Sequence, residues 1–151
     1  MRRAFALGSA VLVLTGCGGS PRIVRHGAPI AIGELVRQYP LGPTANIRAD
    51  QLERTDGASV HLVQVRGGEI PHRHLVHDLV VTVVQGEGTL TVAGTPQALT
   101  AGDLAIVPRG TSHWFVRRGS KPAVALVTFT PPLDAPDLVL DSGVDSEPSA
   151  R

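Results

Sequence analysis

Residues 67–86, with the sequence GGEIPHRHLVHDLVVTVVQG, decide the fold that we expect for this chain. They hold three of its six histidines, His72, His74 and His77. If the segment is extended, His72 and His74 project from the same face, because side chains alternate along a strand. Two neighbouring imidazoles on a rigid face suit a first-row transition metal. The alternative is a polar strand end whose histidines only lie near solvent.

A second segment, residues 102–117 with the sequence GDLAIVPRGTSHWFVR, favours the metal interpretation. Its apolar run, residues 104–107, is expected to be a short strand that leads into the turn at residues 108–110. Proline fixes φ and glycine permits a positive φ, so this turn should be tight and reproducible. His113 then opens the next strand.

The two segments together resemble the cupin superfamily. Its second motif reads G-x5-P-x-G-x2-H-x3-N, and this chain matches it at Gly102, Pro108, Gly110 and His113, with Arg117 in place of the usual asparagine. The resemblance covers residues 58–130. It implies an all-β protein with a single cupin barrel, a double-stranded β-helix or jelly roll.

The first cupin motif reads G-x5-H-x-H-x3,4-E-x6-G. It matches at Gly86 and the two leading histidines, and less well at Gly67 or Gly68, where the spacing is short by one or two residues. Counting back from Gly86 places Leu79 where cupins carry a metal-binding glutamate, whereas the shorter family spacing selects Asp78. The resemblance therefore implies three metal ligands: His72, His74 and His113. The fourth position is left to His77, to Asp78 or to water.

Three neutral imidazoles would leave a divalent ion with its full positive charge. Such a site should keep open positions for water, oxygen or an anionic small molecule, and should lower the pKa of bound water. Imidazole suits several first-row metals, so the residues alone do not select among iron, manganese, zinc, nickel and copper.

Side chains near the three histidines extend the predicted site. Phe115, on the same strand face as the third histidine, is expected to line an apolar pocket or to pack in the core. Arg109 is either a solvated turn residue or the cation that meets an anionic ligand at the barrel mouth. Asp78 could orient a ligand or act as a base. We interpret Glu69 as a solvated turn residue and His61 as a hydrogen-bonded barrel residue.

The chain offers few other catalytic groups, with no Ser–His–Asp signature and no free cysteine nucleophile. The family resemblance favours a metal-dependent enzyme that acts on a small molecule, an oxygenase or an isomerase. The alternatives are a non-catalytic module that binds a metal or small ligand, and a structural protein with a vestigial site. The formal net charge of +1 and the lack of a basic run argue against nucleic-acid binding. Cupins often pair through sheet edges, so a homodimer is plausible.

The N-terminus is typical of an export signal. Arg2 and Arg3 precede an apolar run, residues 4–14, which is too short to span a bilayer as a helix of about 20 residues. The following Leu-Thr-Gly-Cys resembles the bacterial lipobox, so we expect residues 1–16 to be removed and Cys17 to carry a lipid. The protein would then be tied to the membrane through that lipid.

The mature chain would be close to neutral. Removal of Arg2 and Arg3 from the 14 basic side chains leaves 12 against 13 acidic ones. Its one cysteine would be lipidated, so it could form no internal disulfide. We expect an exported lipoprotein on the periplasmic side of the envelope, and Gly18 after the cysteine favours the outer membrane.

At 151 residues the chain fits one domain. We expect a flexible tether at 17–29 and an N-terminal extension at 30–57, with a short helix over 30–38 and a helical turn over 50–54. Short β-branched runs separated by glycine and proline turns predict a barrel over 58–133. Residues 134–151 are expected to form an edge strand, 137–140, and a disordered tail.

Overall fold

Twelve strands and one short helix make up residues 20–141, the part of the chain that the computed structural model describes. In chain order they are β1 (Arg22–Arg25), β2 (Ala28–Ala31), α1 (Ile32–Gln38), β3 (Ile47–Arg54), β4 (Ser59–Val65), β5 (His72–His74), β6 (Asp78–Gln85), β7 (Glu87–Val92), β8 (Thr95–Thr100), β9 (Leu104–Val107), β10 (His113–Arg118), β11 (Ala123–Thr130) and β12 (Leu138–Leu140).

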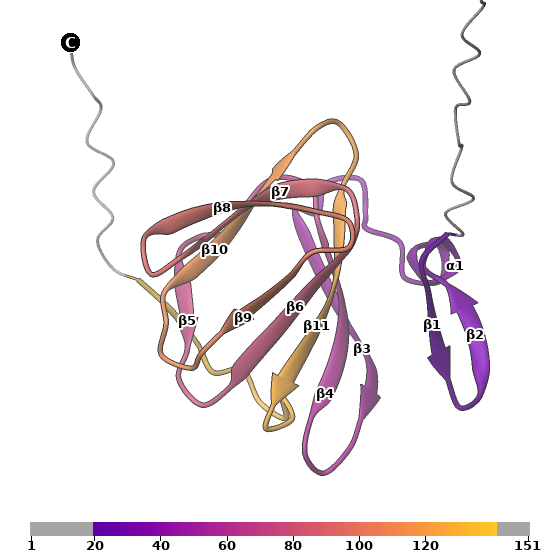
Figure 1. Ribbon diagram of the computed structural model, residues 1–151, viewed down its shortest axis with the longest axis horizontal. Helices are drawn as coiled ribbons and strands as arrows, with labels where there is room; N and C mark the ends of the chain where they lie inside the picture. The colour runs from indigo at the N-terminus through magenta and orange to yellow at the C-terminus, as the bar shows by residue number, and fades with distance from the viewer. Residues whose placement is uncertain (1–19, 142–151) are drawn as a thin grey trace, which may run out of the picture.

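Ten of these strands form two antiparallel sheets that face each other (Figure 1). Their strand orders are β12-β5-β10-β7-β8 and β3-β4-β11-β6-β9. The inward side chains of both sheets make one apolar core, which includes Val83, Leu90, Val107 and Phe129. This is the all-β jelly-roll barrel that the sequence predicts. It extends beyond the predicted limits of 58–133, because β3 and β12 each add an edge strand.

A second apolar cluster covers the outer face of the β3-β4-β11-β6 part of the sheet. Ile32 and Leu35 of α1 pack there with Leu52, Leu62 and Val124, and all five are buried. The helix begins two residues later than predicted, because Ile30 belongs to β2. Its packing fixes the N-terminal extension against the barrel (Figure 1).

The predicted tether is wrong for the described residues from 20 onward. Strands β1 and β2 pair as a hairpin, with Arg25 opposite Ala28 across the two-residue turn His26-Gly27. Both turn residues have positive φ, 49° and 79°, which is the geometry that matches the twist of paired strands. Counting glycines and prolines predicts flexibility, whereas here Gly27 helps to form the turn and Pro29 lies in β2. The exposed His26 ring lies 3.0 Å from the Glu53 carboxylate.

The predicted helical turn at 50–54 is also wrong, because these residues belong to β3. The sequence Gln-Leu-Glu-Arg favours a helix only weakly, and pairing with β4 along the sheet edge overrides that preference. Leu52 is buried beneath α1, while its charged neighbours face solvent in part.

The edge strand predicted at 137–140 is confirmed as β12, which pairs with β5. Asp141, the first residue of the predicted tail, donates a 3.0 Å hydrogen bond from its N–H to the Pro71 carbonyl oxygen, so it is ordered. Residues 142–151 lie outside the described residues, as do Cys17 and the predicted signal peptide. Within residues 20–141, no helix is long and apolar enough to cross a membrane.

Candidate metal centre

Two paired strands bring the three predicted ligands together. His72 and His74 point from the same face of β5, and His72 lies directly opposite His113 of β10 in the antiparallel pair. The ring centroids lie 4.4 Å apart for His72 and His113, 5.4 Å for His72 and His74, and 5.6 Å for His74 and His113. All three rings are buried, and each offers a nitrogen within 4.8 Å of the others.

The backbone orients two of these rings. His72 Nδ1 lies 2.8 Å from the carbonyl oxygen of Ile70, and His113 Nδ1 lies 2.9 Å from that of Thr111. A carbonyl only accepts, so each Nδ1 carries the proton and donates it. The lone pair is then on Nε2, which is the nitrogen left for a metal.

Asp137 orients the third ring. Its Oδ1 lies 2.7 Å from His74 Nδ1, so this imidazole also donates from Nδ1 and keeps the lone pair on Nε2. The other oxygen, Oδ2, accepts a 3.0 Å hydrogen bond from the backbone N–H of Val76. Burial tends to raise the pKa of Asp137, but the Val76 N–H and the two adjacent histidines outweigh it and hold the pKa below its usual range. Asp137 is therefore an anion, which favours metal binding at His74.

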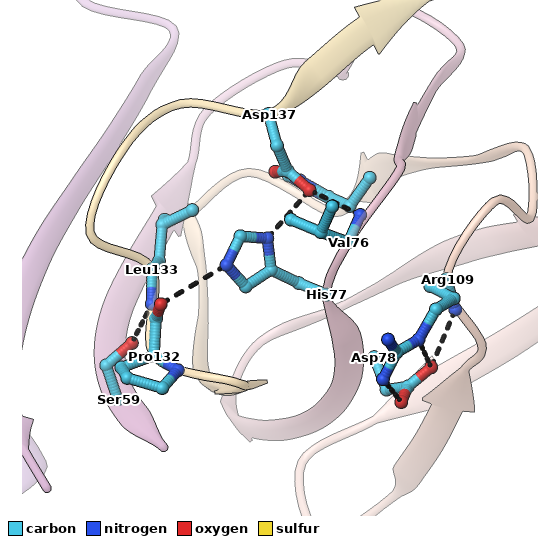
Figure 2. A network of polar contacts seen from close by, with 9 residues as sticks. Ser59, Val76, His77, Asp78, Arg109, Pro132, Leu133 and Asp137 are labelled. Atoms are coloured by element: carbon cyan, nitrogen blue, oxygen red, sulfur yellow. Dashed lines mark hydrogen bonds and ion pairs between the residues drawn. The ribbon is translucent and has the colours of Figure 1, made fainter. Parts of the chain in front are cut away.

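His77, a candidate fourth ligand, lies on the far side of the same carboxylate. Figure 2 shows its ring between Asp137 and Pro132. Its Nδ1 lies 2.7 Å from Asp137 Oδ2 and has no partner with hydrogen-bond geometry among the described residues. Its Nε2 lies 3.3 Å from the Pro132 carbonyl oxygen. His77 therefore supports Asp137 and does not join the three clustered imidazoles.

Burial favours the neutral form of two of the clustered imidazoles, His113 and His74. It lowers the pKa of His113 to about 4, and it also lowers the pKa of His74. Neutral imidazole is the form that binds metals, so at neutral pH these groups need not release a proton first.

Asp78 and Arg109 pair with each other (Figure 2). Arg109 donates to the carboxylate from Nη2 over 2.6 Å and from its backbone N–H over 2.9 Å. The hydrogen bonds from Arg109 lower the pKa of Asp78 to about 2. Both side chains are largely exposed, and neither lines the cavity beside the imidazoles. Leu79, at the position of the usual glutamate, is buried in that cavity's wall.

Two adjoining cavities meet at the imidazoles. The inner one, of about 90 Å³, lies within the barrel and is lined mainly by valine, leucine and phenylalanine side chains, including that of Phe115, which also belongs to the apolar core. The outer one, of about 580 Å³, forms the mouth between β3, β5 and the segment that carries β12. His72, His74 and Glu69 line both.

The position of Glu69 corrects the sequence analysis, which interpreted it as a solvated turn residue. Its backbone N–H donates to the carbonyl oxygen of Phe115, and its Oε2 accepts a 2.8 Å hydrogen bond from the Phe115 N–H. Burial raises the pKa of Glu69. A bend at Pro71 interrupts the strand alternation, so Glu69 faces the cavity although it has the opposite parity to His72. The one signal in the sequence that Glu69 lies at the site is its position three residues before His72.

His61 is a hydrogen-bonded barrel residue, as predicted. Its Nε2 lies 2.9 Å from Ser59 Oγ, and its ring packs edge-on against Phe129 with centroids 5.0 Å apart. It belongs to neither of the two groups of potential ligands, which are the three clustered imidazoles and the group His74, His77 and Asp137.

A two-sheet barrel with histidines facing inward from paired strands defines the cupin type of β-barrel. Residues 59–129 match the family described as Cupin domain. An uncharacterized protein of Aquifex aeolicus (strain VF5) is 38% identical over 108 residues, which cover 72% of this chain and 88% of the relative. The chain belongs to the cupin superfamily, whose members commonly bind transition metals.

Solved structures support the same fold. The structure of KdgF from Halomonas sp. is similar with a TM-score of 0.56 and 27% sequence identity, over 59% of this chain and 82% of that one. A protein with a double-stranded beta-helix domain from Klebsiella pneumoniae has a TM-score of 0.61 at 22% identity, over 72% of this chain and 95% of that one. The second likeness concerns the fold alone.

Proposed function

We propose that the protein is a metal-binding cupin that holds one divalent transition metal at His72, His74 and His113 and binds or transforms a small molecule there. The observation that carries this proposal is the shared orientation of the three buried rings. Each directs Nδ1 at an oxygen acceptor and leaves Nε2 for coordination. The donor set fits iron, manganese, zinc, nickel or copper.

The surrounding residues suit chemistry on a small molecule. A bound ion would supply Lewis acidity or, if redox-active, electron transfer. The chain holds the ligand rings rigid through Asp137 and two backbone carbonyls, and its apolar walls exclude water. Glu69 is the only described carboxylate that lines the inner cavity. This arrangement and the family favour a metal-dependent enzyme, an oxygenase or an isomerase.

The second candidate is a non-catalytic module that captures a metal or a small ligand. Leu79 in place of the usual glutamate and Arg117 in place of the usual asparagine favour it. The two candidates differ in turnover: the enzyme consumes oxygen or converts a substrate when loaded with its metal, whereas the module only binds.

Elemental analysis of the full chain, purified in detergent after exposure to each of the five metals, tests the site. We expect about one equivalent of a preferred metal. The His72→Ala/His113→Ala double variant should lose it, whereas His26→Ala, which removes an exposed histidine, should retain it. Wild-type protein that is folded by circular dichroism and binds none of the ions would contradict the proposal.

We further propose that the protein is an outer-membrane lipoprotein on the periplasmic side, anchored by lipid on Cys17. The support is the sequence alone: Arg2 and Arg3, a short apolar run, and the lipobox-like Leu-Thr-Gly-Cys. Metabolic labelling with radioactive palmitate should mark the wild type and leave Cys17→Ser unlabelled. Equal labelling of both would exclude Cys17 as the acceptor.

A further inference from the structure

The cavity beside the imidazoles contains a carboxylate that metal binding does not use. Glu69 lines both the inner cavity and the mouth, so its carboxylate lies where these spaces meet the cluster. It is absent from the groups of residues whose ligand atoms lie close enough to share one ion. Its position is therefore suited to contact a molecule bound beside the metal.

The hydrogen bonding of Glu69 is incomplete. Within the described part of the chain its carboxylate accepts one hydrogen bond, from the Phe115 N–H to Oε2, whereas a carboxylate offers about four acceptor positions. Burial raises its pKa, because desolvation outweighs the opposing effects of His72 and the Phe115 N–H. Glu69 is partly buried, and its free acceptor positions can take a hydrogen bond from a ligand that supplies a donor in the cavity.

The walls around Glu69 are mostly apolar. Ile70, Leu138 and Leu140 line the mouth, and their exposed fractions are 65%, 47% and 54%. No arginine or lysine is among the described residues that line either cavity. Arg109, which the sequence suggested as an anion contact, is instead paired with Asp78. Apart from a bound metal, nothing at this site compensates a negatively charged ligand, and the Glu69 carboxylate would repel one.

These features, together with the proposed metal site on which this inference rests, identify a ligand class. We propose that the site binds a compact, largely apolar molecule whose hydroxyl or other proton-donating group hydrogen-bonds to Glu69. The apolar part of the molecule covers Ile70, Leu138 and Leu140 at the mouth. Glu69 is thus the residue that selects a neutral proton donor over a small anion.

The test compares two probes on the metal-loaded full chain in detergent. In mildly acidic buffer, where its hydroxyls stay protonated, 4-nitrocatechol is a neutral molecule that combines hydroxyl donors with an aromatic ring and changes its absorbance on binding, whereas oxalate is still a small dianion. Wild type should bind 4-nitrocatechol more tightly than oxalate. Glu69→Gln should weaken 4-nitrocatechol binding about tenfold or more and strengthen oxalate binding, because it removes the charge. Glu87→Gln, which changes an exposed carboxylate away from the cavity, is the control.

The readouts separate this inference from the proposed function. Elemental analysis should show the same metal content in wild type, Glu69→Gln and Glu87→Gln, and thermal melting should show that all three are folded. Equal 4-nitrocatechol affinity in wild type and Glu69→Gln, with metal bound to both, would overturn the role of Glu69 alone. Tighter binding of oxalate than of 4-nitrocatechol by wild type would overturn the ligand class. Folded wild type without metal would overturn the site itself.

Discussion

Asp137 Oδ1 lies 2.7 Å from His74 Nδ1, so a carboxylate next to the last strand orients a ring on β5, 63 residues earlier in the chain. Strand β5 has only three residues and lies between β12 and β10. Its pairing with β12 places Leu138 opposite His74 and Leu140 opposite His72. The C-terminal segment is therefore part of the candidate metal centre, both through its backbone and through Asp137.

Replacing Asp137 should weaken metal binding. Asp137→Ala removes the acceptor that fixes the His74 ring and its proton position, and such losses typically lower metal affinity about 10- to 100-fold. Asp137→Asn should have a smaller effect, because its amide oxygen can still accept from His74. Competition with a coloured chelator measures the affinities. Asp50→Asn, which breaks an ion pair with Arg48 on β3, is the matched control. Unchanged affinity in Asp137→Ala would show that this contact does not orient the ligand.

The metal-free protein should lose stability as the pH falls from about 6.5 to about 4. Burial lowers the pKa of folded His113 to about 4, whereas an imidazole in the unfolded chain titrates near 6.5. Between these values the unfolded state binds more protons, so acid favours unfolding. The loss from this residue should be on the order of 1–3 kcal/mol. Urea unfolding in chelator across this range measures it.

The matching variant for this pH dependence is His113→Gln, which removes the titrating ring and keeps a polar side chain. Its stability should fall less between these pH values. A wild-type free energy of unfolding that stays constant over the range would contradict a neutral, buried His113 in the metal-free fold.

A methyl group on Gly88 should disturb the wall of the inner cavity. A Cβ added there would lie 2.0 Å from Phe115 Cζ, far inside van der Waals contact, so the ring or the β7 backbone must move. Overpacking of this kind costs about 1–3 kcal/mol. Gly57→Ala is the control, because no atom lies within 4 Å of its added Cβ. If urea unfolding shows that Gly88→Ala is as stable as the wild type, the Phe115 ring does not lie against Gly88.

The Asp78–Arg109 pair should be dispensable for metal binding. Asp78→Asn should keep the wild-type metal content, because the carboxylate is bound to Arg109 outside the cavity. The pairing holds the pKa of Asp78 at about 2, below its ordinary value of 3.8. The ion pair therefore stabilises the fold fully at pH values above 3.8, and this stabilisation is lost as the pH falls through about 2. The free energy of unfolding should fall slightly less steeply with acid in Asp78→Asn than in the wild type. Loss of metal comparable with that of Asp137→Ala would instead make Asp78 a ligand.

The sequence predicts the barrel and its three clustered histidines because their signals are local. His72 and His74 are two residues apart in a strand, and His113 follows a turn whose proline and glycine fix its geometry. The residues around them escaped prediction for identifiable reasons. Asp137 reaches the site only through the pairing of β12 with β5, and the bend at Pro71 reverses the face on which Glu69 lies. No periodicity encodes either relationship.

The wrong predictions for the N-terminal part of the chain, a tether and a helical turn at 50–54, have a different origin. Strand β3 forms because a paired edge is available beside β4, and its own composition does not require a strand. The β1–β2 hairpin depends on a turn in which His26 has a positive φ, a conformation uncommon for residues other than glycine.

The β1–β2 hairpin also limits how far the folded domain could lie from a lipid on Cys17. The Pro21 carbonyl oxygen accepts a 2.9 Å hydrogen bond from Ile32, so the chain is tied to the folded domain from that residue onward. Four residue steps separate Cys17 from Pro21, and even a fully extended chain would span at most about 14 Å over them. A lipid on Cys17 would therefore hold the barrel against the bilayer surface.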